Sequence, residues 1–130
     1  MTRRRSKPSP ERLLTSVELQ LMHILWTLGG GTVREVMAEL PAERPLAYTS
    51  VATMLRILEQ KGVLRSQPCE RAHRYEPVFD REEYQGFALD QVVGKVFEGE
   101  RLAVVRRLVD GGLSEREMET LRRLIDERTK

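Results

Sequence analysis

A short signature that starts helices occurs three times in this chain and strongly limits its possible folds. It is a Ser or Thr followed three residues later by Glu, and it occupies residues 15–18, 32–35 and 114–117. In this capping box the hydroxyl accepts a hydrogen bond from a backbone N–H of the first turn, and the carboxylate accepts one from the capping residue. Apolar residues at helical spacing follow each box. The sequence therefore predicts a chain built mainly of helices.

The first three predicted helices follow one another closely. The first ends at the glycines of 29–31, the second ends at Pro41, and the third runs from about Tyr48 to Lys61. Gly and Pro end helices because Gly adopts left-handed backbone easily and Pro has no N–H to donate. The first helix is apolar on two faces, so we expect it to pack between neighbours.

Two short strands are predicted after these helices. Residues 63–66 and 73–76 have the strand pattern, and residues 68–71 form the hairpin tip between them. Three helices followed by a hairpin are the parts of a winged helix-turn-helix. The predicted fold class is mainly α with a small β-hairpin, in which an N-terminal winged helix-turn-helix precedes a C-terminal helical dimerisation region.

The chain is predicted to be helical again from Asp80 onward. Asp80 and Glu83 resemble a cap pair, and Gly99 and the glycines at 111–112 separate three helices. So short a helical segment cannot bury its wide apolar stripes alone, which indicates a second copy as the partner. The residues assigned to this dimerisation surface are Tyr84, Phe87, Val92, Val96, Phe97, Leu102, Val105, Leu108, Met118, Leu121, Leu124 and Ile125.

Charge is distributed unevenly over three expected segments. These are a basic arm without regular structure at residues 1–12, a winged-helix domain at 13–79 and a helical dimerisation domain at 80–130. The net charge is +2, but the arm is basic, the middle segment is neutral and the last is acidic. Such a distribution suits a polyanion approached from one side, with an ordinary solvated surface as the alternative.

The exposed face of the third predicted helix is unusual for a surface helix. It carries Thr49, Ser50, Thr53 and Arg56, where Glu and Lys are more common. Short hydroxyl side chains allow close approach to base edges, and the Thr methyl group can contact the methyl group of thymine. We therefore predict that this helix lies in the major groove of DNA, with Arg56 reaching a guanine or a phosphate.

Other basic residues are expected to contact the phosphate backbone, which gives salt-dependent affinity without sequence information. His73 is expected to pack or to contact a phosphate as well. The predicted backbone contacts are Arg34, Arg44, Lys61, Arg65, Arg71 and Arg74, with Arg3, Arg4 and Arg5 of the arm entering a minor groove.

Composition and motifs exclude several other classes of protein. The apolar runs are far shorter than the ~20 residues that cross a bilayer, and Pro8 and Pro10 interrupt any secretory signal. The single cysteine, Cys69, excludes an internal disulfide framework and is interpreted as incidental, with a redox switch as the alternative. We recognise no catalytic constellation, so no enzyme, metal or cofactor is expected. The expected location is the cytoplasm.

From residue 14 onward the sequence resembles the penicillinase-repressor family of bacterial winged-helix regulators. Three strings that carry the resemblance are LTSVE at 14–18 with Leu25-Trp26, TVREV at 32–36, and RAHRY at 71–75 with Pro77. The most specific string is RPLAYTSV at 44–51, which continues to LEQKG at 58–62. The resemblance implies a homodimeric repressor whose winged helix reads a palindromic operator and whose C-terminal helices form the dimer.

The chain departs from this family's pattern in two ways. Antibiotic-responsive members are cut in the dimerisation region, best known at an asparagine–phenylalanine bond, and this chain contains no asparagine. Either another bond is cut or another signal is used, and a membrane metalloprotease sensor stays open as a partner. Copper-responsive members carry paired cysteines near the C terminus, and no cysteine follows Cys69.

The predicted function is that of a sequence-specific, DNA-binding transcriptional repressor that acts as a homodimer on a palindromic operator. The alternative is a winged-helix module that binds another protein and does not read DNA. That alternative predicts large apolar residues on the exposed face of the third helix, where this sequence has hydroxyl groups.

Overall fold

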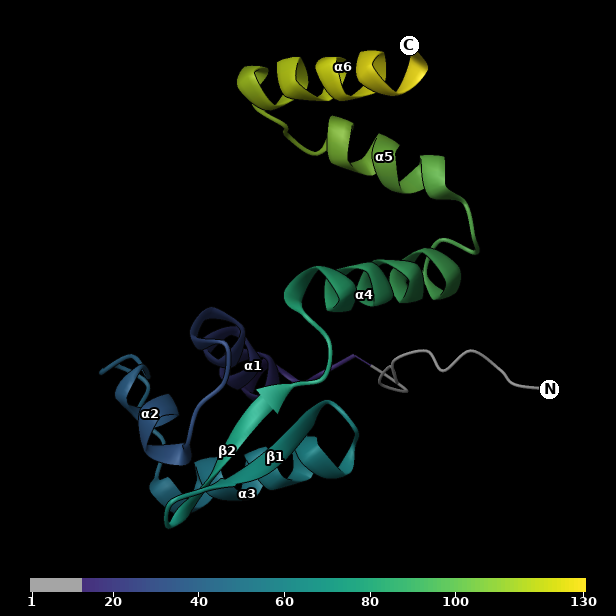
Figure 1. Cartoon of the computed structure of the whole chain (residues 1–130). Helices are drawn as coiled ribbons and strands as arrows, with labels where there is room; N and C mark the ends of the chain where they lie inside the picture. The colour runs from purple at the N-terminus through teal and green to yellow at the C-terminus, as the bar shows by residue number, and fades with distance from the viewer. Residues whose placement is uncertain (1–12) are drawn as a thin grey trace, which may run out of the picture. The chain divides into compact units, whose positions relative to one another are not determined.

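The computed structural model describes residues 13–130, so the predictions for the arm and its Arg3, Arg4 and Arg5 lie outside the described residues (Figure 1). The described chain is mainly helical with one two-stranded antiparallel sheet, which confirms the predicted fold class. The elements are α1 (Ser16–Leu28), α2 (Val33–Ala38), α3 (Tyr48–Gln60), β1 (Leu64–Cys69), β2 (Ala72–Pro77), α4 (Arg81–Lys95), α5 (Arg101–Asp110) and α6 (Glu115–Thr129).

All three predicted capping boxes form, at the starts of α1, α2 and α6. The cap pair before α4 is reciprocal in the same way. The Asp80 N–H donates to Glu83 at 2.8 Å, and the Glu83 N–H donates to Asp80 at 2.8 Å. The helix starts predicted from these residues are therefore confirmed. By contrast, α3 begins after Ala47 without a side-chain cap, so its position depends on packing.

The core lies between α1, α3 and the hairpin. α1 contributes three fully buried side chains and packs further apolar residues against the same core, as its two apolar faces predicted. Fully burying one such side chain is worth about 1.5–3 kcal/mol. The fully buried residues of the core are Leu21, Met22, Leu25, Val36, Val51, Leu55, Leu58, Val63 and Leu64.

The hairpin is longer than predicted and its turn is tighter. The register runs from Leu64 opposite Pro77 to Cys69 opposite Ala72, so Pro68 and Cys69 belong to β1 and not to the tip. β2 also pairs with Gly31 on its other side, which leaves β1 as an edge. Pro is tolerated on an edge strand because its missing N–H need not pair with a neighbour.

Two compact units make up the chain, and the division between them falls at Ala88 and Leu89, inside α4. This division is later than the predicted boundary at residue 80. The first half of α4 belongs to the winged-helix unit because Tyr84 is buried in its core and Phe87 packs against that core. Both residues were predicted to form the dimerisation surface. Tyr84 is instead buried in this core, whereas Phe87 packs against the core and is partly exposed.

The second unit contains the rest of α4 with α5 and α6. Neither α5 nor α6 has a buried residue. A membrane-spanning helix, which needs a long apolar stretch, does not occur between residues 13 and 130.

Candidate DNA-binding surface

α3 presents one apolar and one polar side, as the sequence predicts. Val51, Leu55 and Leu58 are fully buried. The four residues predicted to read DNA are all exposed, and they are Thr49, Ser50, Thr53 and Arg56. A helix of this kind offers hydroxyl groups and a guanidinium to a groove, while its other side is fixed to the core.

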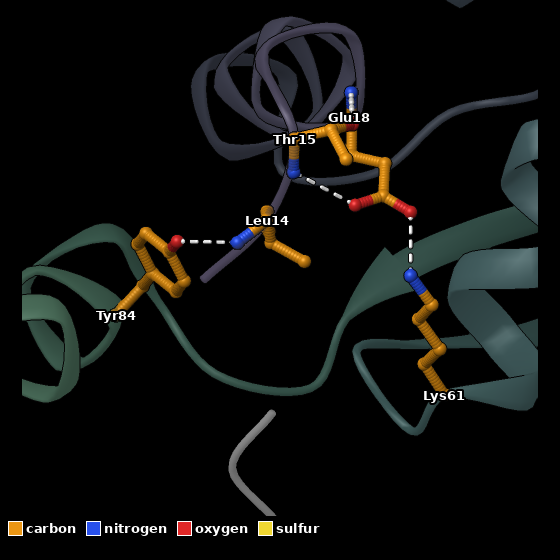
Figure 2. A network of polar contacts seen from close by, with 5 residues as sticks. All are labelled: Leu14, Thr15, Glu18, Lys61 and Tyr84. Atoms are coloured by element: carbon orange, nitrogen blue, oxygen red, sulfur yellow. Dashed lines mark hydrogen bonds and ion pairs between the residues drawn. The ribbon is translucent and has the colours of Figure 1, made fainter. Parts of the chain in front are cut away.

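An ion pair fastens the end of α3 to the start of α1. The Lys61 ammonium lies 2.7 Å from Oε2 of Glu18, and Oε1 of the same carboxylate accepts a hydrogen bond from the Thr15 N–H (Figure 2). Glu18 is buried, whereas the Lys61 side chain is about half exposed. The sequence assigned Lys61 to the DNA backbone and Glu18 only to a cap, so it missed this link.

The environment of Glu18 favours its charged form. Burial raises the pKa of the carboxyl, but the hydrogen bond from Lys61 lowers it. The Thr15 N–H and the positive charge of Lys61 lower it further, so the pKa lies below its usual value. The ion pair is therefore fully formed at neutral pH.

The same end of α1 is bonded to α4. The Leu14 N–H donates to the Tyr84 hydroxyl at 2.9 Å (Figure 2). Nearby, the Trp26 indole N–H donates to the Phe79 carbonyl at 3.0 Å. These bonds join α1 and its N-terminal flank to α4 and to the segment between β2 and α4, so one helix holds both α3 and the first half of α4.

Two predicted phosphate contacts on the hairpin are paired within the chain. Glu76 accepts from Arg65 at 3.5 Å and from Arg74 at 3.4 Å. Arg74 also lies against Gly30, where an added Cβ would come within 2.8 Å of its guanidinium. The charges of both arginines are thus partly balanced by one carboxylate.

A second set of basic residues surrounds a cavity of about 260 Å³ between the hairpin, α2 and α3, which we call the hairpin cavity. The Arg34 guanidinium lies over the Tyr48 ring, 5.5 Å from its centroid. The cavity is lined by Thr32, Val33, Arg34, Tyr48, Ala52, Arg71, Ala72, His73 and Tyr75. Sequence reasoning treated Arg34, Arg71 and His73 separately and missed Tyr48. The structure brings all four together.

Arg44 does not belong to this cavity. It lines a separate groove of about 470 Å³ beside α1, together with His23 and Glu39. The two depressions share no lining residue. Among the described residues predicted to contact the DNA backbone, Arg34 and Arg71 line the hairpin cavity, as does His73.

A buried tyrosine that lines the hairpin cavity, Tyr75, is held in its neutral form. Burial raises the pKa of Tyr75, and the nearby Glu59 carboxylate raises it further, while Arg56 acts in the opposite direction. The Tyr75 backbone is fixed by a reciprocal pair of hydrogen bonds with Gly31, at 2.9 and 2.8 Å. This side of the cavity is therefore a neutral, well-anchored wall.

Residues 14–127 match the family described as Penicillinase repressor. The chain belongs to the penicillinase repressor family. A relative in this family is "Transcriptional regulator BlaI" of Mycobacterium tuberculosis (strain CDC 1551 / Oshkosh), to which the chain is 35% identical over 116 residues, covering 88% of this chain and 83% of that protein. The protein of the same name from strain ATCC 25618 / H37Rv matches to the same extent. The family resemblance read from the sequence is confirmed.

The fold is also shared with a solved structure of this family. The solution structure of the DNA binding domain of the repressor BlaI matches with a TM-score of 0.51 and 28% sequence identity. The match covers 61% of this chain and 94% of that domain. It confirms that this member of the penicillinase repressor family contains a winged helix.

The second unit carries an exposed apolar surface. The side chains of Val96 and Leu102 are 69% and 79% exposed, respectively. Other large apolar residues exposed here are Leu89, Val105, Leu108, Leu124 and Ile125. Large apolar patches on soluble proteins mark interaction sites, and these exposed residues are candidates for one.

Proposed function

We propose that this chain is a transcriptional repressor that binds operator DNA as a homodimer in the cytoplasm. The observation that carries the proposal is the exposed hydroxyl and guanidinium face of α3 in a chain of the penicillinase repressor family. In this proposal α3 lies in the major groove, where Thr49, Ser50, Thr53 and Arg56 contact base edges and flanking phosphates.

The hairpin and α2 supply contacts to the phosphate backbone. Arg34 and Arg71 lie beside α3 around the hairpin cavity. Contacts of this type fix the register of a protein on the duplex and make its affinity salt-dependent. The exposed face of α3 is polar from Thr49 to Arg56, which favours a nucleic-acid partner over a protein partner. The large apolar side chains that α3 exposes, Tyr48 and Ile57, lie on either side of this stretch.

The exposed apolar residues of the second unit supply the dimer. α5 and α6 bury none of their residues within the chain, although Leu102, Leu108 and Ile125 are large and apolar. A second copy that uses the same surface would cover them by two-fold symmetry. The dimer then presents two α3 helices to half-sites about one helical turn apart, or a multiple of it.

Selection of DNA by the purified chain tests this function. The full chain is incubated with a pool of random duplexes, bound duplexes are amplified, and sedimentation equilibrium gives the oligomeric state. We expect an enriched palindrome with half-site centres about 34–36 Å apart or a multiple, a dimer, and affinity that falls with salt. A monomer that enriches no sequence would contradict the proposal.

A further inference from the structure

The hairpin cavity is assembled from parts of the chain that are far apart in the sequence. Arg34 comes from α2, Tyr48 and Ala52 come from α3, and Arg71 and His73 come from the turn and from β2. In Figure 1 the β1–β2 turn lies at the same end of α3 as α2. The cavity exceeds the roughly 30 Å³ of one liquid water severalfold, so a hydrated tetrahedral anion fits.

The cationic side chains of this cavity are not neutralised by the protein. Among residues 13–130, Arg34 and Arg71 form no ion pair with a carboxylate, whereas Arg65 and Arg74 both pair with Glu76. No carboxylate lines the cavity. Its walls therefore carry the positive charge of two guanidinium groups with no internal counter-charge.

Of the acidic residues next to a lining residue in the chain, Glu35 and Glu76 are engaged elsewhere, and Glu70 is an exposed turn residue that does not line the cavity. Glu35 accepts a hydrogen bond from the Thr32 N–H at 2.9 Å, as part of the cap of α2. Glu59 accepts one from the Ser66 hydroxyl at 2.7 Å. Arg34 and Arg71 are both exposed, so water solvates their charges in the free protein, and no lining carboxylate competes with an incoming anion for them.

The guanidinium groups that line the cavity also have the planar shape for two-point contacts with a phosphate. The Arg34 guanidinium is held over the Tyr48 ring, and Arg71 approaches from the hairpin. Guanidinium groups bind phosphate oxygens with pairs of parallel N–H bonds, which a lysine cannot do. Two arginines from separate elements of the chain suit the two unesterified oxygens of one phosphodiester.

We propose that the hairpin cavity binds a single phosphate of the DNA backbone, shared by Arg34 and Arg71, with His73 as a further donor. The inference rests on the proposed function and adds a specific contact to it. Ala52 lines the cavity and adjoins Thr53 in the chain. One anchored phosphate therefore fixes the register of the exposed α3 face against the bases.

The number of phosphates can be counted from the salt dependence of binding. For duplex DNA the slope of log affinity against log salt changes by about 0.9 for each phosphate that the protein neutralises. The slope is measured for the full chain on the duplex that it selects from a random pool. The variants are Arg34→Gln, Arg71→Gln and the two combined, with Arg128→Gln on α6 as a control of equal charge change.

The homodimer carries two copies of the cavity. If the arginines of each copy share one phosphate, the double variant therefore reduces the slope by about 1.8, and each single variant reduces it by no more than that. Two separate phosphates in each copy instead give a reduction of about 3.6 in the double variant with additive single effects, which overturns the shared site. Arg128→Gln leaves the slope unchanged. Thermal melting by circular dichroism checks that each variant folds.

A neutral methylphosphonate placed at successive positions of the same duplex locates the phosphate. One position in each half-site is expected to weaken wild-type binding while leaving the double variant unaffected. If every position affects both proteins equally, the cavity holds no DNA phosphate, although the proposed function survives as long as the wild type binds its duplex. Failure of the wild type to bind any duplex overturns both proposals.

Discussion

The link between Glu18 and Lys61 predicts an asymmetric response to mutation. Lys61→Met leaves a buried carboxylate with only the Thr15 N–H as a partner. Removing one partner of a fully buried ion pair costs about 3–5 kcal/mol, and the bond retained from Thr15 lowers that figure. We expect Lys61→Met to reduce the free energy of unfolding by about 2–3 kcal/mol.

The partner substitution is expected to cost less. Glu18→Gln keeps a side-chain oxygen for the Thr15 N–H, and the half-exposed Lys61 ammonium turns to water. The loss is one hydrogen bond between charged groups, about 1–2 kcal/mol. The double variant should cost less than the sum of the two, because each single change already breaks the same contact.

Urea denaturation of the full chain at a fixed concentration measures these values, since unfolding of a dimer depends on concentration. Each variant is compared with the wild type at pH 7. Equal costs below about 0.5 kcal/mol for both single variants, as is usual for surface substitutions, would show that the pair is a surface contact and refute the reasoning.

The remaining predictions concern pH, base readout, the dimer and the hairpin. Folding lowers the pKa of Glu18, so the ion pair contributes fully to the free energy of unfolding above the usual value of 4.5. This contribution is lost as pH falls through the lowered pKa. The difference in stability between wild type and Glu18→Gln should therefore shrink in urea titrations at acid pH. Thr53→Ala should change preference at one base pair by about 1–3 kcal/mol, as read by repeating the duplex selection. Leu102→Asp should produce monomers in sedimentation equilibrium, because it places a charge in the proposed dimer surface. Gly30→Ala should lower stability by about 1–3 kcal/mol in denaturant melts, since φ there is +133° and a Cβ would contact Arg74.

The helices were predictable because their signals are local. A capping box uses residues three apart. The hydrogen bonds of Thr15 with Glu18 and of Asp80 with Glu83 could therefore be predicted from the sequence. The exposed face of α3 was predictable for the same reason, since helical periodicity alone separates Thr53 from Leu55. Features of this type need no knowledge of how distant segments meet.

The features that sequence reasoning missed depend on contacts between distant residues. Glu18 meets Lys61 across 43 positions, and Leu14 meets Tyr84 across 70. No periodic pattern encodes such pairs. Likewise, an apolar stripe in the sequence does not indicate which surface covers it. Tyr84 was therefore assigned to the dimer interface, although it is buried within its own unit. The hairpin cavity was missed for the same reason, because its basic residues come together only in the folded chain.

The bonds from α1 to its neighbours affect which half-site spacing a dimer would prefer on DNA. Lys61 at the end of α3 and Tyr84 in α4 are both bonded to residues at the start of α1. α3 and the first half of α4 therefore form part of one compact unit that ends at Ala88. In the proposed dimer, the distance between two α3 helices is then set by the residues from Leu89 onward. Substitutions there should change the preferred spacing of half-sites, whereas substitutions on α3 should change the preferred bases, and the duplexes selected by each class of variant separate the two effects.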